Sequence, residues 1–364
     1  MERRKFLTGA AAGGAAVAAA TLSAPAISQG IKQVKMVTTW PKNFPGLGTG
    51  AESLAKRITA MTGGKLEVKV FAAGELVPPF QSFDAVSAGN AEMSHSVSYY
   101  WQGKSPAFNF FAAVPFGLNA AEHAAWILNG GGMTMWEQLC DQFGVKPFMR
   151  ASTGVQMGGW YRKEINTLDD YKGLKFRMPG LGGEVLRKLG AAVVNLPGGE
   201  IFPALQAGTI DGTEWVGPWN DLAFGFYRVA KFYYWPGFHE PCTTGEVMVN
   251  KKWFGTLTKE EQQIIEVAVQ AEALREYSEF VYHSSTALDV LLTKHKVVLK
   301  KFSDDLLTEI GRVSGEVVAE VGHKDAFTTK VYDSFIDFRR QAIGWTRIGE
   351  QGFVNARSLP FKYS

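Results

Sequence analysis

The chain has 364 residues, which is long for a single hydrophobic core and predicts two domains. Hydrophobic residues make up 46% and charged residues 20% of the sequence, proportions that are ordinary for a globular protein. The formal net charge is only +3 and no cluster of lysines and arginines stands out, which argues against nucleic acid as a partner.

The N-terminus has the pattern of an export signal. A charged start is followed by a small apolar run that ends on an Ala-x-Ala sequence, so residues 1–26 are predicted to be removed from the folded protein. The Arg3-Arg4 pair and the apolar residues after it resemble a twin-arginine signal, although Glu2 and Thr8 depart from the usual pattern. An ordinary secretory signal and an uncleaved anchor are the alternatives. No later apolar run approaches the roughly 20 residues that span a bilayer, so we expect a periplasmic protein.

Residues 27–150 are predicted to form most of a first lobe. Strands and helices alternate along this part of the sequence. The rhythm predicts βαβ units and a largely parallel sheet. The expected strands are 34–40, 65–71 and 91–98, and the expected helices are 50–61 and 82–87.

The same rhythm restarts near Gly144 and predicts a second lobe over residues 151–244. We therefore expect an α/β protein of the two-lobed periplasmic binding protein type, with a cleft between the lobes. The strands expected here are 145–150, 175–178 and 192–196, and the helices are 181–189 and 201–207.

The C-terminal third is predicted to be helical, with parts of 245–364 completing the first lobe. Thr258 and Glu261 have the spacing of a capping box, and apolar residues then recur at helical spacing. We predict one long helix over 258–294 that spans both lobes or pairs with a second subunit in a homodimer. Val267, Leu274 and Val281 are among its apolar positions, and further helices are expected at 303–321 and 324–343.

Two sequence blocks resemble the signature of the substrate-binding proteins of tripartite ATP-independent periplasmic (TRAP) transporters. The first is Tyr-Lys-Gly-Leu-Lys-Phe-Arg-Met-Pro-Gly at 171–180, and the second is Ala-Leu-Gln-Ala-Gly-Thr-Ile-Asp-Gly-Thr-Glu at 204–214. Shorter matches at 74–76, 114–116 and 249–253 extend the resemblance over the whole mature chain. It implies a receptor that captures a small organic anion and delivers it to a membrane permease.

Within that family, Gln156, Arg177, Glu214 and Trp215 resemble the branch that binds 2-oxo or 2-hydroxy monocarboxylates, such as pyruvate, together with a metal cation. The resemblance places the anion on Arg177, whose planar guanidinium matches a carboxylate. It places the cation between the Gln156 amide oxygen, the Glu214 carboxylate and the Trp215 main-chain carbonyl, which are ligands suited to sodium or calcium. A dicarboxylate or a sugar acid is the alternative ligand.

Charge balance favours sodium over calcium. Arg177 and Glu214 cancel, as do a monocarboxylate and a sodium ion, and a buried site that is neutral avoids a large desolvation cost. Calcium would require one more carboxylate. Glu240 is the candidate, and an acid at the rim of the cleft is the alternative interpretation of that residue.

Aromatic residues are expected to wall the ligand. Tyr99 and Tyr100 follow the third predicted strand, and loops after parallel strands face the crevice of open α/β sheets. Core packing is the alternative for each ring. Further candidates for the walls are Trp101, Trp215, Trp219 and Phe238.

The sequence carries no strong enzyme motif. It has no nucleophile elbow, zinc-protease helix or Walker A sequence, so we do not expect an enzyme. His239 beside Glu240 could be an acid–base pair of a lyase or hydrolase, which is the enzyme alternative. Cys140 and Cys242 could form one disulfide after export, and their spacing in sequence leaves this open.

Overall fold

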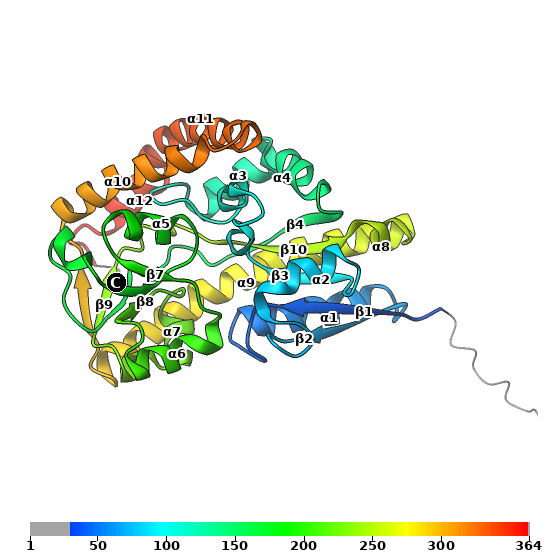
Figure 1. The fold of residues 1–364 in the computed structure, drawn as a ribbon, viewed down its shortest axis with the longest axis horizontal. Helices are drawn as coiled ribbons and strands as arrows, with labels where there is room; N and C mark the ends of the chain where they lie inside the picture. Colours follow the sequence, from blue (N-terminus) through cyan, green and yellow to red (C-terminus); the bar gives the residue numbers. More distant parts are fainter. Residues whose placement is uncertain (1–29, 363–364) are drawn as a thin grey trace, which may run out of the picture.

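A computed structural model describes residues 30–362, so the predicted signal at 1–26 lies outside the described part of the chain. Two β-sheets and a set of covering helices form two lobes (Figure 1). Among the described residues, no helix has the length and apolar character needed to cross a membrane.

The first lobe is built on a five-stranded sheet. Strand β1 is parallel to β2 and β3, whereas β10 is antiparallel to β3 and β4. The expectation of a largely parallel sheet was therefore wrong, because β10 returns to this sheet from the second lobe without a crossover helix. The strand order is β2 (Leu66–Phe71), β1 (Lys32–Thr38), β3 (Met93–Ser96), β10 (Thr244–Asn250) and β4 (Val145–Ser152).

The second lobe is built on a six-stranded sheet of mixed direction. Strand β5 is antiparallel to both of its neighbours, and the other pairings are parallel. Strand β11 belongs to the C-terminal third of the chain and still joins this sheet. The residue boundaries given above for the two lobes remain a prediction. The strand order is β11 (Val298–Lys301), β9 (Phe232–Trp235), β5 (Gly159–Tyr161), β8 (Gly212–Thr213), β6 (Lys175–Arg177) and β7 (Ala192–Val194).

One long helix, α9 (Lys259–Thr293), runs along both lobes (Figure 1). It begins as predicted, since the Thr258 hydroxyl accepts from the Glu261 amide at 3.1 Å and the Glu261 carboxylate accepts from the Thr258 amide at 2.8 Å. It packs against β4 and α1 of one lobe and against α7 of the other. The two-lobed fold with a spanning helix is thus confirmed.

The other helices cover the sheets, and five of them, α3, α4, α7, α8 and α12, were not predicted. The helices of the first lobe are α1 (Leu47–Met61), α2 (Ser82–Ser87), α3 (Ala120–Asn129), α4 (Gly132–Asp141) and α8 (Lys251–Gly255). Those that follow the strands of the second lobe are α5 (Gly180–Lys188), α6 (Gly198–Ala207) and α7 (Pro218–Phe224). The C-terminal helices are α10 (Asp304–Gly322), α11 (Ala326–Ile348) and α12 (Glu350–Arg357).

The buried face of α9 contains two glutamates. Glu272 accepts from the Arg57 guanidinium at 2.7 Å, and Glu276 forms a fully buried ion pair with Arg150 of β4. These acids interrupt the hydrophobic period that would otherwise mark the buried face. Apolar positions that the sequence suggested as helix contacts instead face solvent, with exposed fractions of 40% for Val267, 73% for Leu274 and 56% for Val281.

The two cysteines lie in separate contacts and form no disulfide. The Cys140 thiol is 3.8 Å from the sulfur of Met248, and the Cys242 thiol donates to the Leu118 carbonyl at 3.4 Å. Both are buried.

Candidate functional site

The candidate site lies where the two lobes meet. Arg177 ends β6, and Glu214 and Trp215 directly follow β8. Because β6 and β8 are parallel neighbours, their carboxyl ends reach the same edge of the sheet. Gln156 lies on the segment that leads from β4 of the first lobe to β5 of the second. The topology therefore brings these four residues to the junction of the lobes.

Two hydrogen bonds to main-chain carbonyls orient the Arg177 side chain and leave one of its donor groups available for a ligand. Its Nη1 donates to the main-chain carbonyl of Glu214 at 2.9 Å, and its Nε donates to the Leu196 carbonyl at 3.2 Å. The guanidinium is 1% exposed and lies 5.0 Å from the centre of the Trp215 ring. Nη2 is buried without a hydrogen-bond partner among residues 30–362. A buried cationic donor in this state suits an anion.

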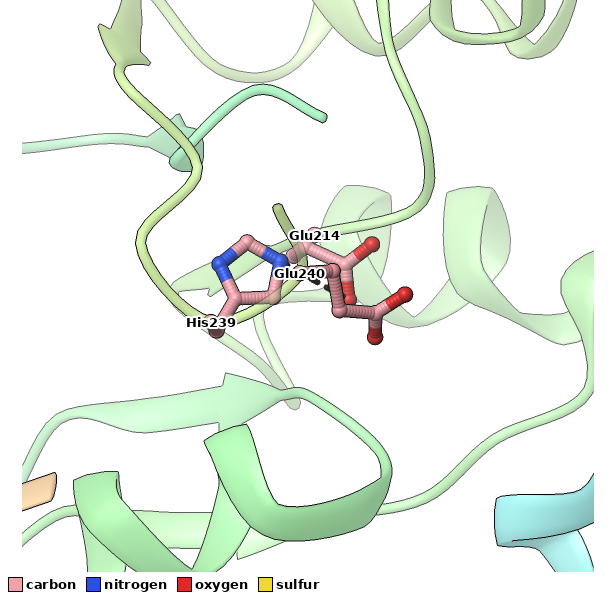
Figure 2. Close-up of side chains that lie close together, drawn as sticks. All are labelled: Glu214, His239 and Glu240. Atoms are coloured by element: carbon pink, nitrogen blue, oxygen red, sulfur yellow. Dashed lines mark ion pairs between the residues drawn. The ribbon is translucent and has the colours of Figure 1, made fainter. Parts of the chain in front are cut away.

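Glu214, His239 and Glu240 form a buried cluster (Figure 2). Arg177 lies beside it. One ligand atom from each member of the cluster lies within 4.8 Å of the others, and Glu214 Oε2 is 3.6 Å from both His239 Nε2 and Arg177 Nη1. Neither carboxylate oxygen of Glu214 nor either ring nitrogen of His239 has a hydrogen-bond partner in the described chain. The cluster therefore has the donor atoms for a cation.

Burial sets the protonation of this cluster. It raises the pKa of Glu214 to about 8, against the opposing effect of Arg177, and it raises the pKa of Glu240 to about 8, with Glu214 adding to the shift. Burial also lowers the pKa of His239 to about 4, so the imidazole is neutral at neutral pH. A cation placed among these groups would favour the ionised carboxylates and would leave His239 uncharged.

Gln156 is oriented by two hydroxyl groups. Its Nε2 donates to Thr243 Oγ1 at 2.7 Å and to Thr153 Oγ1 at 3.1 Å, and its Oε1 is buried without a partner within the described residues. The Thr243 hydroxyl in turn donates to the Glu240 carboxylate. Glu240 is 2% exposed, so the alternative of an acid at the rim of the cleft was wrong.

A small cavity adjoins these groups and is walled by rings from both lobes. Burial raises the pKa of Tyr100 to about 12, an effect that the neighbouring Arg177 opposes, so the phenol remains a hydrogen-bond donor. The lining includes Tyr99, Tyr100, Trp40, Gln156 and Trp215.

Three other aromatic candidates pack elsewhere. The Trp101 indole donates to Glu246 at 2.6 Å in the core of the first lobe. Trp219 stacks on His283 of α9, with ring centroids 4.5 Å apart, and Phe238 stacks on Phe116 at 5.8 Å. These contacts fit the alternative interpretation of the three rings, which is core packing. From the sequence, His239 was considered only as half of an acid–base pair with Glu240, and its place in the buried cluster with Glu214 was not predicted.

Comparisons with known proteins show the family of this chain. Residues 36–325 match the family described as bacterial extracellular solute-binding protein, family 7. The monocarboxylate 2-oxoacid-binding periplasmic protein of Nostoc sp. (strain PCC 7120) is 41% identical, over 98% of this chain and 99% of that protein.

Two solved structures are also similar. One is a TRAP periplasmic solute-binding protein from Pseudoalteromonas atlantica with bound sodium and pyruvate, which is 38% identical with a TM-score of 0.87 over 91% of this chain and 99% of that chain. The other is from Colwellia psychrerythraea with bound calcium and pyruvate, and it is 39% identical with a TM-score of 0.86 over 89% of this chain and 99% of that chain. This chain therefore belongs to the bacterial extracellular solute-binding protein family 7 and is a solute-binding protein of the TRAP transporter type.

Proposed function

We propose that this protein captures pyruvate, or a similarly small 2-oxo monocarboxylate, together with a metal cation, and delivers it to a TRAP permease. The observation that carries the proposal is a set of buried polar atoms that have no partner among residues 30–362: Arg177 Nη2, Gln156 Oε1 and the carboxylate oxygens of Glu214. An anion with a cation would satisfy all of these atoms together. The ligands named for the two similar structures support this assignment.

The ligand atoms are assigned by chemistry. The carboxylate of a 2-oxo acid accepts from Arg177, while one carboxylate oxygen and the 2-oxo oxygen chelate the cation. Gln156 Oε1, the Glu214 carboxylate and the Trp215 carbonyl complete the cation shell. The two similar structures, both with bound pyruvate, support pyruvate over a sugar acid. A dicarboxylate would bury an additional negative charge.

Charge balance allows two cations. With His239 neutral, Arg177 and Glu214 cancel, and a monocarboxylate with sodium leaves the site neutral if Glu240 is protonated. Calcium gives the same neutrality if Glu240 is ionised. Burial raises the pKa of both Glu240 and Glu214 to about 8 in the metal-free site, and a bound cation would lower both values, so the charge of the cation governs the ionisation of Glu240. The similar structures, one with sodium and the other with calcium, support a site that accepts both.

The test is a pyruvate titration of metal-stripped mature protein, followed by tryptophan fluorescence with and without sodium or calcium. We expect saturable quenching that requires the cation, with pyruvate recovered intact at the end. Consumption of pyruvate would instead support the lyase or hydrolase alternative for His239 and Glu240. No response to pyruvate or other monocarboxylates would overturn the ligand assignment.

We also propose that the protein is periplasmic and is exported by the twin-arginine signal.

We further propose a homodimer formed along α9. Exposed apolar side chains on α9, such as Leu274 and Val281, favour burial against a second copy. More exposed apolar residues, among them Trp345, Ile348 and Phe353, lie on α11 and α12.

The homodimer predicts a mass of two chains in light scattering coupled to gel filtration. Leu274→Glu with Val281→Glu should convert the dimer to a monomer, because charges in a buried interface are costly. Leu76→Glu, at a position that is 43% exposed and outside α9, is the control and should remain dimeric. A monomeric parent would overturn the proposal.

A further inference from the structure

A loop of the first lobe packs closely against the second lobe. It comprises residues 41–46 and leads into α1. Phe44 stacks on Phe224 of α7, with ring centroids 4.2 Å apart. Gly46 has a φ of 71°, and a Cβ at this position would lie only 2.8 Å from the Trp219 ring. The loop can therefore approach α7 only because a glycine stands at this point.

Asn220 lies at the centre of this contact and is fully buried in the first turn of α7. Its Oδ1 accepts from the Trp215 indole Nε1 at 3.3 Å, and its Nδ2 donates to the Pro45 carbonyl at 3.1 Å. One amide thus joins a residue of the candidate cation site to the backbone of the opposite lobe.

We propose that Asn220 is a positioning residue that fixes Trp215 and ties it to the Pro45 loop, so that the lobes stay closed around the bound ligand. The inference rests on the proposed function, because Trp215 is the residue assigned to the cation through its carbonyl. No ligand atom is expected to touch Asn220 itself.

The two hydrogen bonds of Asn220 act at different steps. The bond to Pro45 joins separate lobes, so it is present in the closed form and breaks when the lobes part. A contact made only in the closed form stabilises that form relative to the open one. Such a contact lowers the rate of ligand dissociation and leaves the rate of association with the open cleft nearly unchanged. The bond to Trp215 holds its indole beside Arg177, with the ring centre 5.0 Å from the guanidinium. It therefore fixes the relative positions of the two residues assigned to the ligand and the cation.

Asn220→Ala tests the proposal by stopped-flow tryptophan fluorescence of the mature protein with pyruvate and sodium. We expect the dissociation rate to rise about tenfold, which is the effect of losing about one net hydrogen bond, and the association rate to change less than about threefold. Small-angle X-ray scattering should also show less compaction on adding pyruvate and sodium. Asn220→Asp keeps an acceptor for Trp215 but removes the donor to Pro45, and it should also release pyruvate faster.

Asn109→Ala is the matched control. Asn109 is equally buried, and its Nδ2 donates to the Pro106 carbonyl at 3.0 Å within one lobe. This variant should lose similar thermal stability and keep the parent dissociation rate. A dissociation rate within twofold of the parent in Asn220→Ala, or an equal rise in Asn109→Ala, would overturn the role of Asn220.

The failure of the proposed function is separately visible, because the parent would then bind no pyruvate. In that case, the role of Asn220 is tested by the radius of gyration of each protein measured without ligand. A larger radius in Asn220→Ala than in the parent and in Asn109→Ala supports the tie between the lobes, and equal radii reject it.

Discussion

Replacing Arg177 with alanine should weaken pyruvate binding at least about a hundredfold, because removing one partner of a buried charge pair costs about 3 kcal/mol or more. Without the guanidinium, the pyruvate carboxylate and Glu214 would both be buried beside no compensating cationic side chain. Calorimetric titration with pyruvate in sodium buffer measures the loss. Circular dichroism of the same sample should show a folded protein, because the side-chain hydrogen bonds of Arg177 join it to main-chain carbonyls of two loops, at Leu196 and Glu214.

Two further variants make the test specific to the guanidinium at this position. Arg177→Lys keeps the charge but loses the planar fork of donors. This variant should therefore also bind pyruvate much more weakly than the parent. Arg187→Ala removes an exposed arginine of the adjacent helix α5 that pairs with Glu184, and it should retain parent affinity within about twofold, as is usual for a surface ion pair. Parent affinity in Arg177→Ala would mean that the anion binds elsewhere.

The sequence predicted the architecture well where local signals were strong. The capping box at Thr258 predicted the start of α9, and the alternating strands and helices predicted the elements around β1, β2 and β6. The mixed direction of the sheets could not be predicted in the same way. Strand β10 is buried along its whole length and has no alternating pattern, so its place between β3 and β4 depends on tertiary pairing.

The residues proposed for the site are close together in the structure, although their roles remain predictions. Arg177, Glu214 and Gln156 could be named because the family resemblance singled them out. The contribution of Asn220 could not be read from the sequence, because its partners Trp215 and Pro45 meet only when the two lobes pack. The buried acids of α9 were hidden for a similar reason: Glu276 resembles a solvent-exposed helix residue until Arg150 is placed opposite it.

Glu214→Gln should weaken cation-dependent pyruvate binding by about a hundredfold, since a neutral amide cannot supply the anionic ligand of a buried cation. The substitution keeps the shape of the side chain, so the fold is expected to survive. Pyruvate titrations over a series of sodium and calcium concentrations measure the effect. In the parent, the apparent affinity should rise with either cation, and in the variant this dependence should become shallow. An unchanged dependence in Glu214→Gln would show that its carboxylate does not bind the cation.

Glu240→Gln separates a cation ligand from a compensating charge in the same site. Glu240 already accepts from the Thr243 hydroxyl, and its ionised form is needed only if a divalent ion is to leave the site neutral. We expect sodium-supported binding to stay within about threefold of the parent and calcium-supported binding to fall about tenfold, the effect of one uncompensated charge that is partly screened. Equal losses with both cations would make Glu240 a direct ligand. No loss with calcium would mean that another group balances its second charge, and His239 could not be that group because it carries no negative charge.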